Sequence, residues 1–143
     1  MLHWPEGLDV ERFLYEYWQK KPVFLPRAIP SFDSPLDPDE VAGLACEPGI
    51  ESRIVMENSD PPWTLENGPF EPERFGRLPQ TGWSLLVQDV DKHVPESNRV
   101  RAGFRFLPDW RFDDLMVSFA PPGGSVGPHV DAYDVFLVQG LGR

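Results

Sequence analysis

Cysteine is almost absent from this chain: Cys46 stands alone, so no internal disulfide can form. Long apolar runs are missing too, since no window approaches the ~18 consecutive apolar residues of a membrane-spanning helix. The first residues, Met1–Pro5, lack the basic and apolar regions of a secretory signal peptide. We therefore expect a cytoplasmic protein without membrane contact, in which Cys46 is an ordinary buried helix residue.

Positive charge is also scarce. Thirteen Lys and Arg residues stand against 23 Asp and Glu residues, so the net charge is −10 and the pI is about 4.6. Because capture of nucleic acid phosphates needs clustered cations, this composition argues against direct nucleic-acid binding. An acidic surface suits a basic protein partner, although a general need for solubility is the more common reason for such a charge, so the charge does not select this partner.

Helices are expected where apolar residues recur at a spacing of three and four, or where capping residues stand together. The segment Asp9–Lys20 has that spacing, and the following Lys21-Pro22 ends it. Asp37–Glu40 supplies an N-cap, a proline at the first helical position and an acid at the third, so a helix should run from there to near Pro48. Glu71–Phe75 and Pro95–Val100 are expected to be short helical turns.

Strands are expected where β-branched or alternating apolar residues occur between turns. They are predicted at Val23–Leu25, Ile50–Glu57, Trp83–Asp89, Leu115–Ala120 and Val135–Gln139, with a hairpin at Trp63–Phe70 that turns at Asn67-Gly68. Helices come first and strands follow. This order predicts an α+β protein with an antiparallel barrel or sandwich rather than alternating βαβ units.

The most informative segment is Gly123–Asp131, where a glycine-rich turn precedes His129 and Asp131. In a strand, residues i and i+2 project from the same face, so such a pair can present an imidazole and a carboxylate to one point. These are two of the three donors in the 2-His-1-carboxylate triad of non-haem Fe(II) oxygenases. A His-x-Asp pair alone is common by chance, so the flanking sequence must decide its meaning.

Four further segments carry a family resemblance. They are Phe13–Pro22, Trp83–Gln88, Phe104–Ala120 and Tyr133–Arg143. In content and order they closely resemble the bacterial JmjC-type ribosomal oxygenases, which hydroxylate an arginine of a large-subunit ribosomal protein with Fe(II) and 2-oxoglutarate. The resemblance runs from about residue 8 to the last residue. It implies a double-stranded β-helix of the jelly-roll or cupin type.

The resemblance also implies an organisation. Residues 1–80 would be an N-terminal helical and β segment that buttresses the barrel, and residues 81–143 would be the first part of the barrel. The chain would then stop about midway through the barrel. The family's distal metal-binding histidine has no counterpart, because His3 and His93 lie upstream of the His-x-Asp pair, and the basic residue for 2-oxoglutarate falls at or just past Arg143.

We therefore expect a truncated oxygenase that is inactive by itself. Its unpaired strand edges and uncovered apolar face would favour a homodimer of half-barrels, with a lost C-terminal half as the alternative.

The resemblance assigns site residues. His129 and Asp131 would bind Fe(II), and Ser118 matches a position that lines the 2-oxoglutarate pocket, where a hydroxyl can hydrogen-bond a carboxylate. An ordinary surface or core serine remains the alternative for Ser118.

The substrate-binding residues are expected to be Asp113, Asp114 and Tyr133. Two adjacent carboxylates can hold a guanidinium in bidentate fashion, which fits a substrate arginine, unless one of them pairs with Arg105 or Arg111. Tyr133 either faces the pocket or is a core tyrosine. Trp83, Phe106, Trp110 and Phe119 are expected in the core.

Two other function classes stay open. A cupin metalloenzyme acting on a small molecule would usually build its site from several histidines, and this chain shows no such cluster. A non-catalytic binding or interaction protein could keep the fold without turnover. A zinc hydrolase is excluded by the lack of His-Glu-x-x-His and of paired Cys-x-x-Cys.

Overall fold

The structure, a computed structural model, describes residues 2–142 and contains two compact units. The first unit comprises residues 2–34, 98–112 and 131–142, and the second comprises residues 35–97 and 113–130. The predicted division at residue 80 refers to the family architecture and stays a prediction. Within the described residues, no helix has the length and apolar content needed to cross a membrane.

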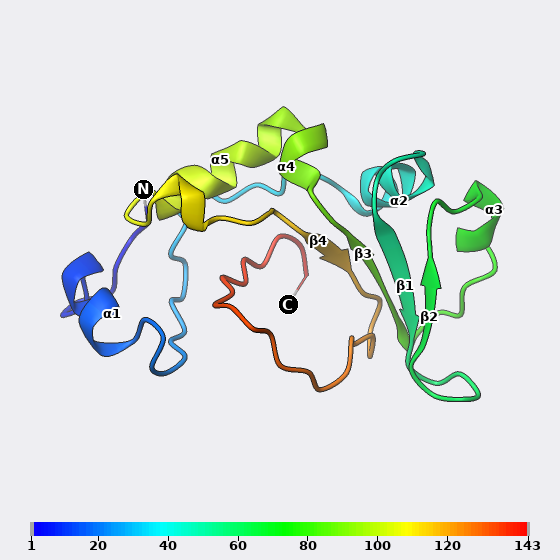
Figure 1. Ribbon diagram of the computed structural model, residues 1–143, viewed down its shortest axis with the longest axis horizontal. Coiled ribbons are helices and arrows are strands. Elements are labelled where there is room, and N and C mark those ends of the chain that lie inside the picture. Colours follow the sequence, from blue (N-terminus) through cyan, green and yellow to red (C-terminus); the bar gives the residue numbers. More distant parts are fainter. Residues whose placement is uncertain (1, 143) are drawn as a thin grey trace. The chain divides into compact units, whose positions relative to one another are not determined.

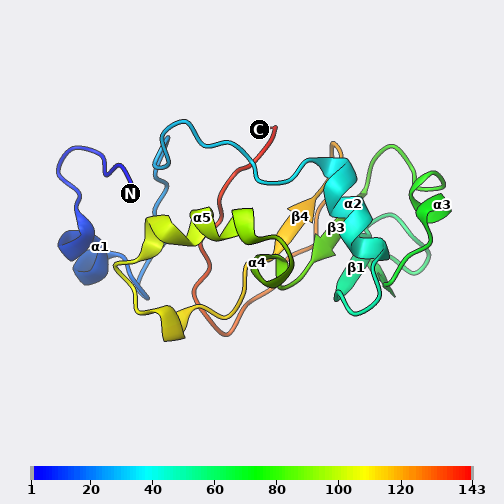
Figure 2. The same cartoon turned by 90° about the horizontal axis from the view of Figure 1, so that it is seen from above.

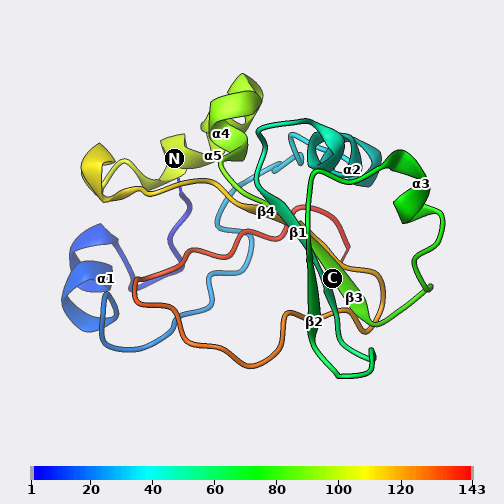
Figure 3. The ribbon, with the colours of Figure 1, turned by 45° about the vertical axis from the view of Figure 1, so that its right-hand side comes forward.

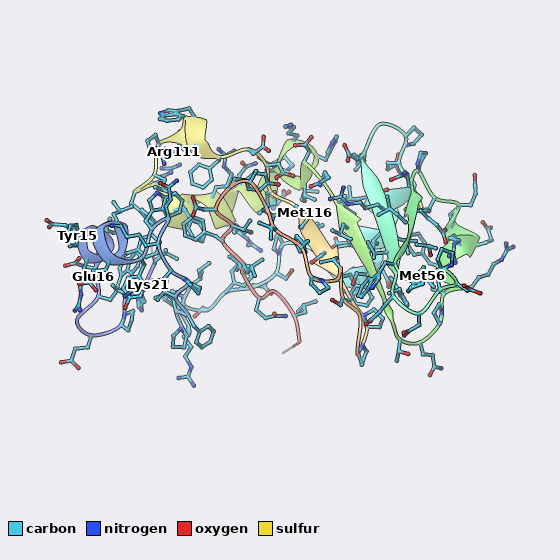
Figure 4. The ribbon with its side chains drawn as sticks, turned by 60° about the horizontal axis from the view of Figure 1, so that its bottom comes forward. Tyr15, Glu16, Lys21, Met56, Arg111 and Met116 are labelled. Carbon is cyan, nitrogen blue, oxygen red and sulfur yellow. The ribbon has the colours of Figure 1, made fainter. Side chains whose placement is uncertain are left out.

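The second unit is built on a four-stranded antiparallel sheet with the order β2-β1-β3-β4 (Figure 1). Its strands are β1 (Ser52–Met56), β2 (Thr64–Asn67), β3 (Trp83–Val87) and β4 (Val117–Phe119). Figure 3 shows β1, β2 and β3 running side by side. Every residue of β3 is buried, as expected for an inner strand that is covered on both faces. Met56 ends β1 and Met116 precedes β4 (Figure 4).

Helix α2 (Pro38–Cys46) packs on this sheet (Figure 2). It begins with the predicted capping box, because the Asp37 carboxylate accepts from the Glu40 amide at 2.8 Å and the Glu40 carboxylate accepts from the Asp37 amide at 2.8 Å. Val41 and Ala45 of α2 join Ile54 in the buried core. The short helices α3 (Pro72–Phe75) and α4 (Val90–His93) and the 3-10 turn η1 (Pro95–Ser97) complete the unit.

The first unit holds helix α1 (Val10–Glu16), on which Tyr15 and Glu16 are labelled in Figure 4. It also holds α5 (Asn98–Arg101) and the 3-10 turns η2 (Ala102–Phe104) and η3 (Asp109–Arg111). Its core is a cluster of aromatic rings whose centroids lie 4.6–6.4 Å apart. The members are Trp4, Phe13, Trp18, Phe104, Phe106 and Phe136. Aromatic pairs at these separations contribute packing energy beyond their buried area.

Several sequence predictions are wrong. Val23–Leu25 and Val135–Gln139 form no strand within the described residues, because a strand needs a neighbouring backbone to complete its hydrogen-bond ladder. Asn67-Gly68 is not the hairpin turn: Asn67 ends β2, the Gly68 amide donates to the Ser52 carbonyl at 2.8 Å, and the turn lies between Met56 and Thr64.

Other differences concern single side chains and one helix end. Trp110 is 79% exposed rather than in a core, while Trp83 is buried as predicted and contacts Phe119. Helix α1 ends at Glu16, earlier than the predicted Lys20, and a turn follows it. Cys46 is only half-buried at the end of α2, and its partial burial raises the pKa of the thiol.

The ion pair between Arg74 and Glu66 gives the second unit a pH dependence. The guanidinium donates to both carboxylate oxygens, at 2.8 and 2.6 Å, and this hydrogen bonding lowers the pKa of Glu66. A carboxylate with a lowered folded-state pKa stabilises above its ordinary pKa, and the stabilisation is lost as the pH falls through the folded-state value.

We expect Arg74→Gln to lower the free energy of unfolding by about 0.2–1 kcal/mol at neutral pH, the range for partly exposed pairs. The difference from wild type should disappear in acid, where Glu66 is protonated in both proteins. Urea unfolding at pH about 7 and at several values falling to about 2 checks this, because the folded-state pKa of Glu66 lies below the ordinary carboxylate value. Arg77→Gln is the matched control, and an Arg74 effect that persists unchanged in acid would contradict the assignment.

Candidate metal-binding segment

The loop that carries His129 begins directly after β4. Its first turn is closed by a hydrogen bond from the Gly124 amide to the Pro121 carbonyl, at 2.8 Å. Gly123 and Gly127 have φ values of +76° and +79°, in the left-handed region that glycine adopts without steric cost. The expectation that these glycines shape the turn agrees with this geometry.

Two glycines of this loop, Gly124 and Gly127, also lie close to other parts of the second unit. A Cβ on Gly124 would lie 2.1 Å from the carbonyl oxygen of Trp83, a backbone atom that can move only if strand β3 moves. A Cβ on Gly127 would lie 3.2 Å from two ring atoms of Trp63. The loop is therefore seated against the start of β3 and against the residue before β2.

Gly124→Ala is expected to destabilise the second unit by roughly 1–3 kcal/mol, the range for overpacked positions, and to loosen the loop. Gly43→Ala is the control, because Gly43 is exposed within α2 and has nothing within 4 Å of the added methyl group. That control should stabilise by about 0.5–1 kcal/mol, since alanine is the better helix former. Urea unfolding with amide exchange at residues 121–129 measures both, and equal effects of the two changes would refute the close contact.

His129 is exposed, and its Nδ1 atom lies 3.0 Å from the carbonyl oxygen of Gly127. Asp131 is also exposed. Neither residue lies in a strand, so the strand geometry expected for the pair is not the one observed. His129 belongs to the second unit and Asp131 to the first, and the chain keeps them two residues apart.

The donor chemistry of this pair suits a ferrous ion, which accepts imidazole nitrogen and carboxylate oxygen. Both side chains are open to solvent, so an ion can reach them. Residues 2–142 contain no group of three or more His, Cys, Asp or Glu side chains arranged to hold a metal. The described part of the chain thus holds an imidazole and a carboxylate two residues apart, and their role as metal ligands stays a prediction.

The other predicted site residues lie as follows. Ser118 is exposed in β4, opposite Leu86 of β3. Asp113 is exposed just before that strand. Tyr133 is 66% exposed, so it is not a core tyrosine.

Asp114 is more constrained than its neighbour. Its carboxylate accepts from the Asp89 amide at 3.2 Å and from the Gln88 side-chain amide at 2.9 Å. The Gln88 carbonyl in turn accepts from the Arg53 guanidinium at 3.0 Å. Sequence reasoning missed this network and the contact of Trp63 with Gly127, because each joins segments that are distant along the chain.

Comparison with known proteins gives these features a context. A family model described as a JmjC domain matches residues 99–143. The ribosomal protein uL16 3-hydroxylase of Escherichia coli is 50% identical over 143 residues, which cover 99% of this chain and 36% of that protein. A probable ribosomal oxygenase of Haemophilus influenzae is 42% identical over 139 residues, covering 97% of this chain and 34% of the relative.

Solved structures agree. The E. coli ribosomal oxygenase YcfD superposes with a TM-score of 0.83 and 46% identity, over 93% of this chain and 35% of that one. A complex of YcfD with cobalt and 2-oxoglutarate gives a TM-score of 0.81 and 47% identity, over 89% and 34%. The expected α+β class and partial JmjC, cupin-like fold are confirmed. By sequence and by fold, the chain matches the JmjC-type ribosomal oxygenases and spans about a third of the length of these relatives.

Proposed function

We propose that this chain is part of a cytoplasmic 2-oxoglutarate- and Fe(II)-dependent oxygenase that hydroxylates an arginine of a large-subunit ribosomal protein. The observation that carries the proposal is the 50% identity to a uL16 3-hydroxylase along 99% of the chain. A relative solved with cobalt and 2-oxoglutarate supports it, because cobalt(II) accepts the same imidazole and carboxylate donors as iron(II).

In this proposal His129 and Asp131 are two of the metal ligands, and Ser118 donates a hydrogen bond to 2-oxoglutarate. When bound, iron and 2-oxoglutarate together supply the activation of dioxygen. In this proposal the chain itself contributes an imidazole, a carboxylate and a hydroxyl group. A further residue has to supply the third metal donor.

The experiment that tests the proposal uses a chimera: this chain joined to the parts of the E. coli relative that lie outside the matched third. With Fe(II), 2-oxoglutarate and ribosomal protein uL16, we expect succinate release and a mass gain of one oxygen atom on an arginine of uL16. A folded chimera that releases no succinate and leaves uL16 unchanged would refute the proposal. Oxygen transfer to a small molecule but not to uL16 would favour the alternative cupin enzyme.

Substitutions of Asp113 and Asp114 distinguish a role in substrate binding from a role in folding. Asp113 is exposed, so Asp113→Asn should weaken turnover of the ribosomal substrate while uncoupled 2-oxoglutarate consumption survives. Losing one charge-assisted hydrogen bond costs on the order of 1.5–3 kcal/mol, or about 10-fold to 100-fold in turnover. Asp114→Asn should impair both activities, because Asp114 also accepts hydrogen bonds within the fold. Equal loss of both activities in Asp113→Asn would contradict its role with the substrate. Tyr133→Phe, in the same assay, tests whether the Tyr133 hydroxyl group contacts the substrate.

For the isolated chain we propose weak metal binding, no hydroxylation and a homodimer. The segment after His129 exposes apolar side chains, with Val130 at 96% and Leu137 at 91% exposure. Exposed apolar residues in an extended segment favour association. Sedimentation equilibrium and intact mass decide the matter, and a monomer of 16.3 kDa with tight Fe(II) binding and turnover would refute all three statements.

A further inference from the structure

Trp63 has a backbone conformation that a bulky residue rarely adopts. Its φ is 63°, in the left-handed region, and its side chain is 40% exposed. The loop that holds it is closed by its own hydrogen bonds: the Trp63 amide donates to the Glu57 carbonyl at 3.3 Å, and the Ser59 hydroxyl accepts from the Thr64 amide at 3.1 Å. Such conformations persist only where the surrounding structure enforces them.

The Trp63 ring is directed at the glycine loop. A methyl group on Gly127 would lie 3.2–3.3 Å from three atoms of the ring, so the indole packs against the bare backbone of this glycine. The Gly127 amide also donates to the Ser125 hydroxyl at 3.0 Å. Gly127 is thus held by a ring contact at its Cα atom and by a hydrogen bond at its amide.

The carbonyl group of Gly127 contacts His129, the candidate metal ligand. Its oxygen lies 3.0 Å from Nδ1 of His129. A carbonyl oxygen can only accept, so this contact requires the proton of the neutral imidazole on Nδ1 and leaves the lone pair on Nε2. Histidines that bind metals commonly donate their second ring N–H to such an acceptor, which fixes the tautomer and the ring orientation.

We propose that Trp63 is a positioning residue: by packing on Gly127 it holds the carbonyl that selects the Nδ1–H tautomer of His129 and presents Nε2 as the donor atom. The identity of the ion as iron rests on the proposed function, whereas the two contacts of Gly127, with Trp63 and with His129, do not.

The test is imidazole ¹⁵N NMR on the whole 143-residue chain, at a pH of about 8.5 where an ordinary histidine is neutral. His3 and His93 are internal references. We expect wild type and Trp63→Phe to show the Nδ1–H form at His129, and Trp63→Leu to show a mixture of tautomers. Gly127→Ala adds a methyl group that displaces the Trp63 ring, so it should give the same mixture of tautomers. Unchanged amide signals of β3 verify that each variant is folded.

An unchanged tautomer in both Trp63→Leu and Gly127→Ala, or an Nε2–H form in wild type, would overturn the proposal. Cobalt(II) titration of the same samples, followed by paramagnetic broadening of the His129 signal, tests the link to metal binding. We expect Trp63→Leu to weaken the affinity by about 10-fold, as for other partners of metal-binding histidines, and Trp63→Phe to restore it. If cobalt leaves His129 unaffected while the tautomers respond as expected, the metal assignment fails and the positioning role of Trp63 stands.

Discussion

His129→Ala is expected to reduce succinate release by the chimera by more than about 100-fold, even at saturating Fe(II). Loss of a group that merely supports a metal-binding histidine already costs about 10-fold to 100-fold in affinity or activity, so loss of the ligand itself should cost more. The remaining two donors of a facial triad cannot hold the ion in the geometry that leaves positions open for 2-oxoglutarate and dioxygen.

The matched control is His93→Ala. His93 is an exposed histidine at the end of α4, upstream of the His-x-Asp pair, and no role in the site is assigned to it. Its substitution should leave succinate release unchanged. Full activity in His129→Ala, or an equal loss in the two variants, would show that the imidazole of His129 does not bind the metal.

Ile54→Ala is expected to lower the free energy of unfolding of the second unit by about 2–5 kcal/mol, the range for removing a large buried aliphatic side chain. Ile54 is fully buried in β1, directly opposite Leu85 of β3, and packs in the core that includes Val41 and Ala45 of α2. The cost combines the lost burial with the cavity that remains. Because domains are stable by only about 5–15 kcal/mol, this change would remove a large part of the total.

Urea unfolding followed by circular dichroism gives the measurement. Ile54→Val should cost only about 0.5–1.5 kcal/mol, because it removes one methylene group. Leu65→Ala is the control on the neighbouring strand: Leu65 is 54% exposed, so its loss should cost much less. Similar costs for Ile54→Ala and Leu65→Ala would contradict the assignment of the core to this face of the sheet.

Elements that depend on neighbouring residues were predictable from the sequence. The start of α2 followed from Asp37 and Glu40, because a capping box is made by residues three apart. The buried strand β3 followed from its run of apolar residues between turns. The Gly123–Asp131 motif was recognisable for the same reason, since its meaning lies in short spacings and in the segments that flank it.

Elements that depend on distant partners were not predictable. Val135–Gln139 has the composition of a strand, yet no described backbone pairs with it. Asn67-Gly68 is a favoured turn sequence, but the Gly68 amide donates to Ser52, and the chain turns earlier. In the first case a remote partner strand is missing, and in the second a hydrogen bond to a remote segment outweighs the local preference.

The sequence by itself therefore determined the family likeness and the α+β class, because short motifs carry that information, and it also proposed His129 and Asp131 as the candidate donors. Tertiary structure alone decided how His129 is presented. Trp63 and Gly127 are far apart in the chain, and only the packing of the glycine loop against the rest of the second unit brings the ring to the backbone. In the proposal above, that packing holds the Gly127 carbonyl at 3.0 Å from Nδ1 of His129, and the packing itself cannot be read from any local pattern.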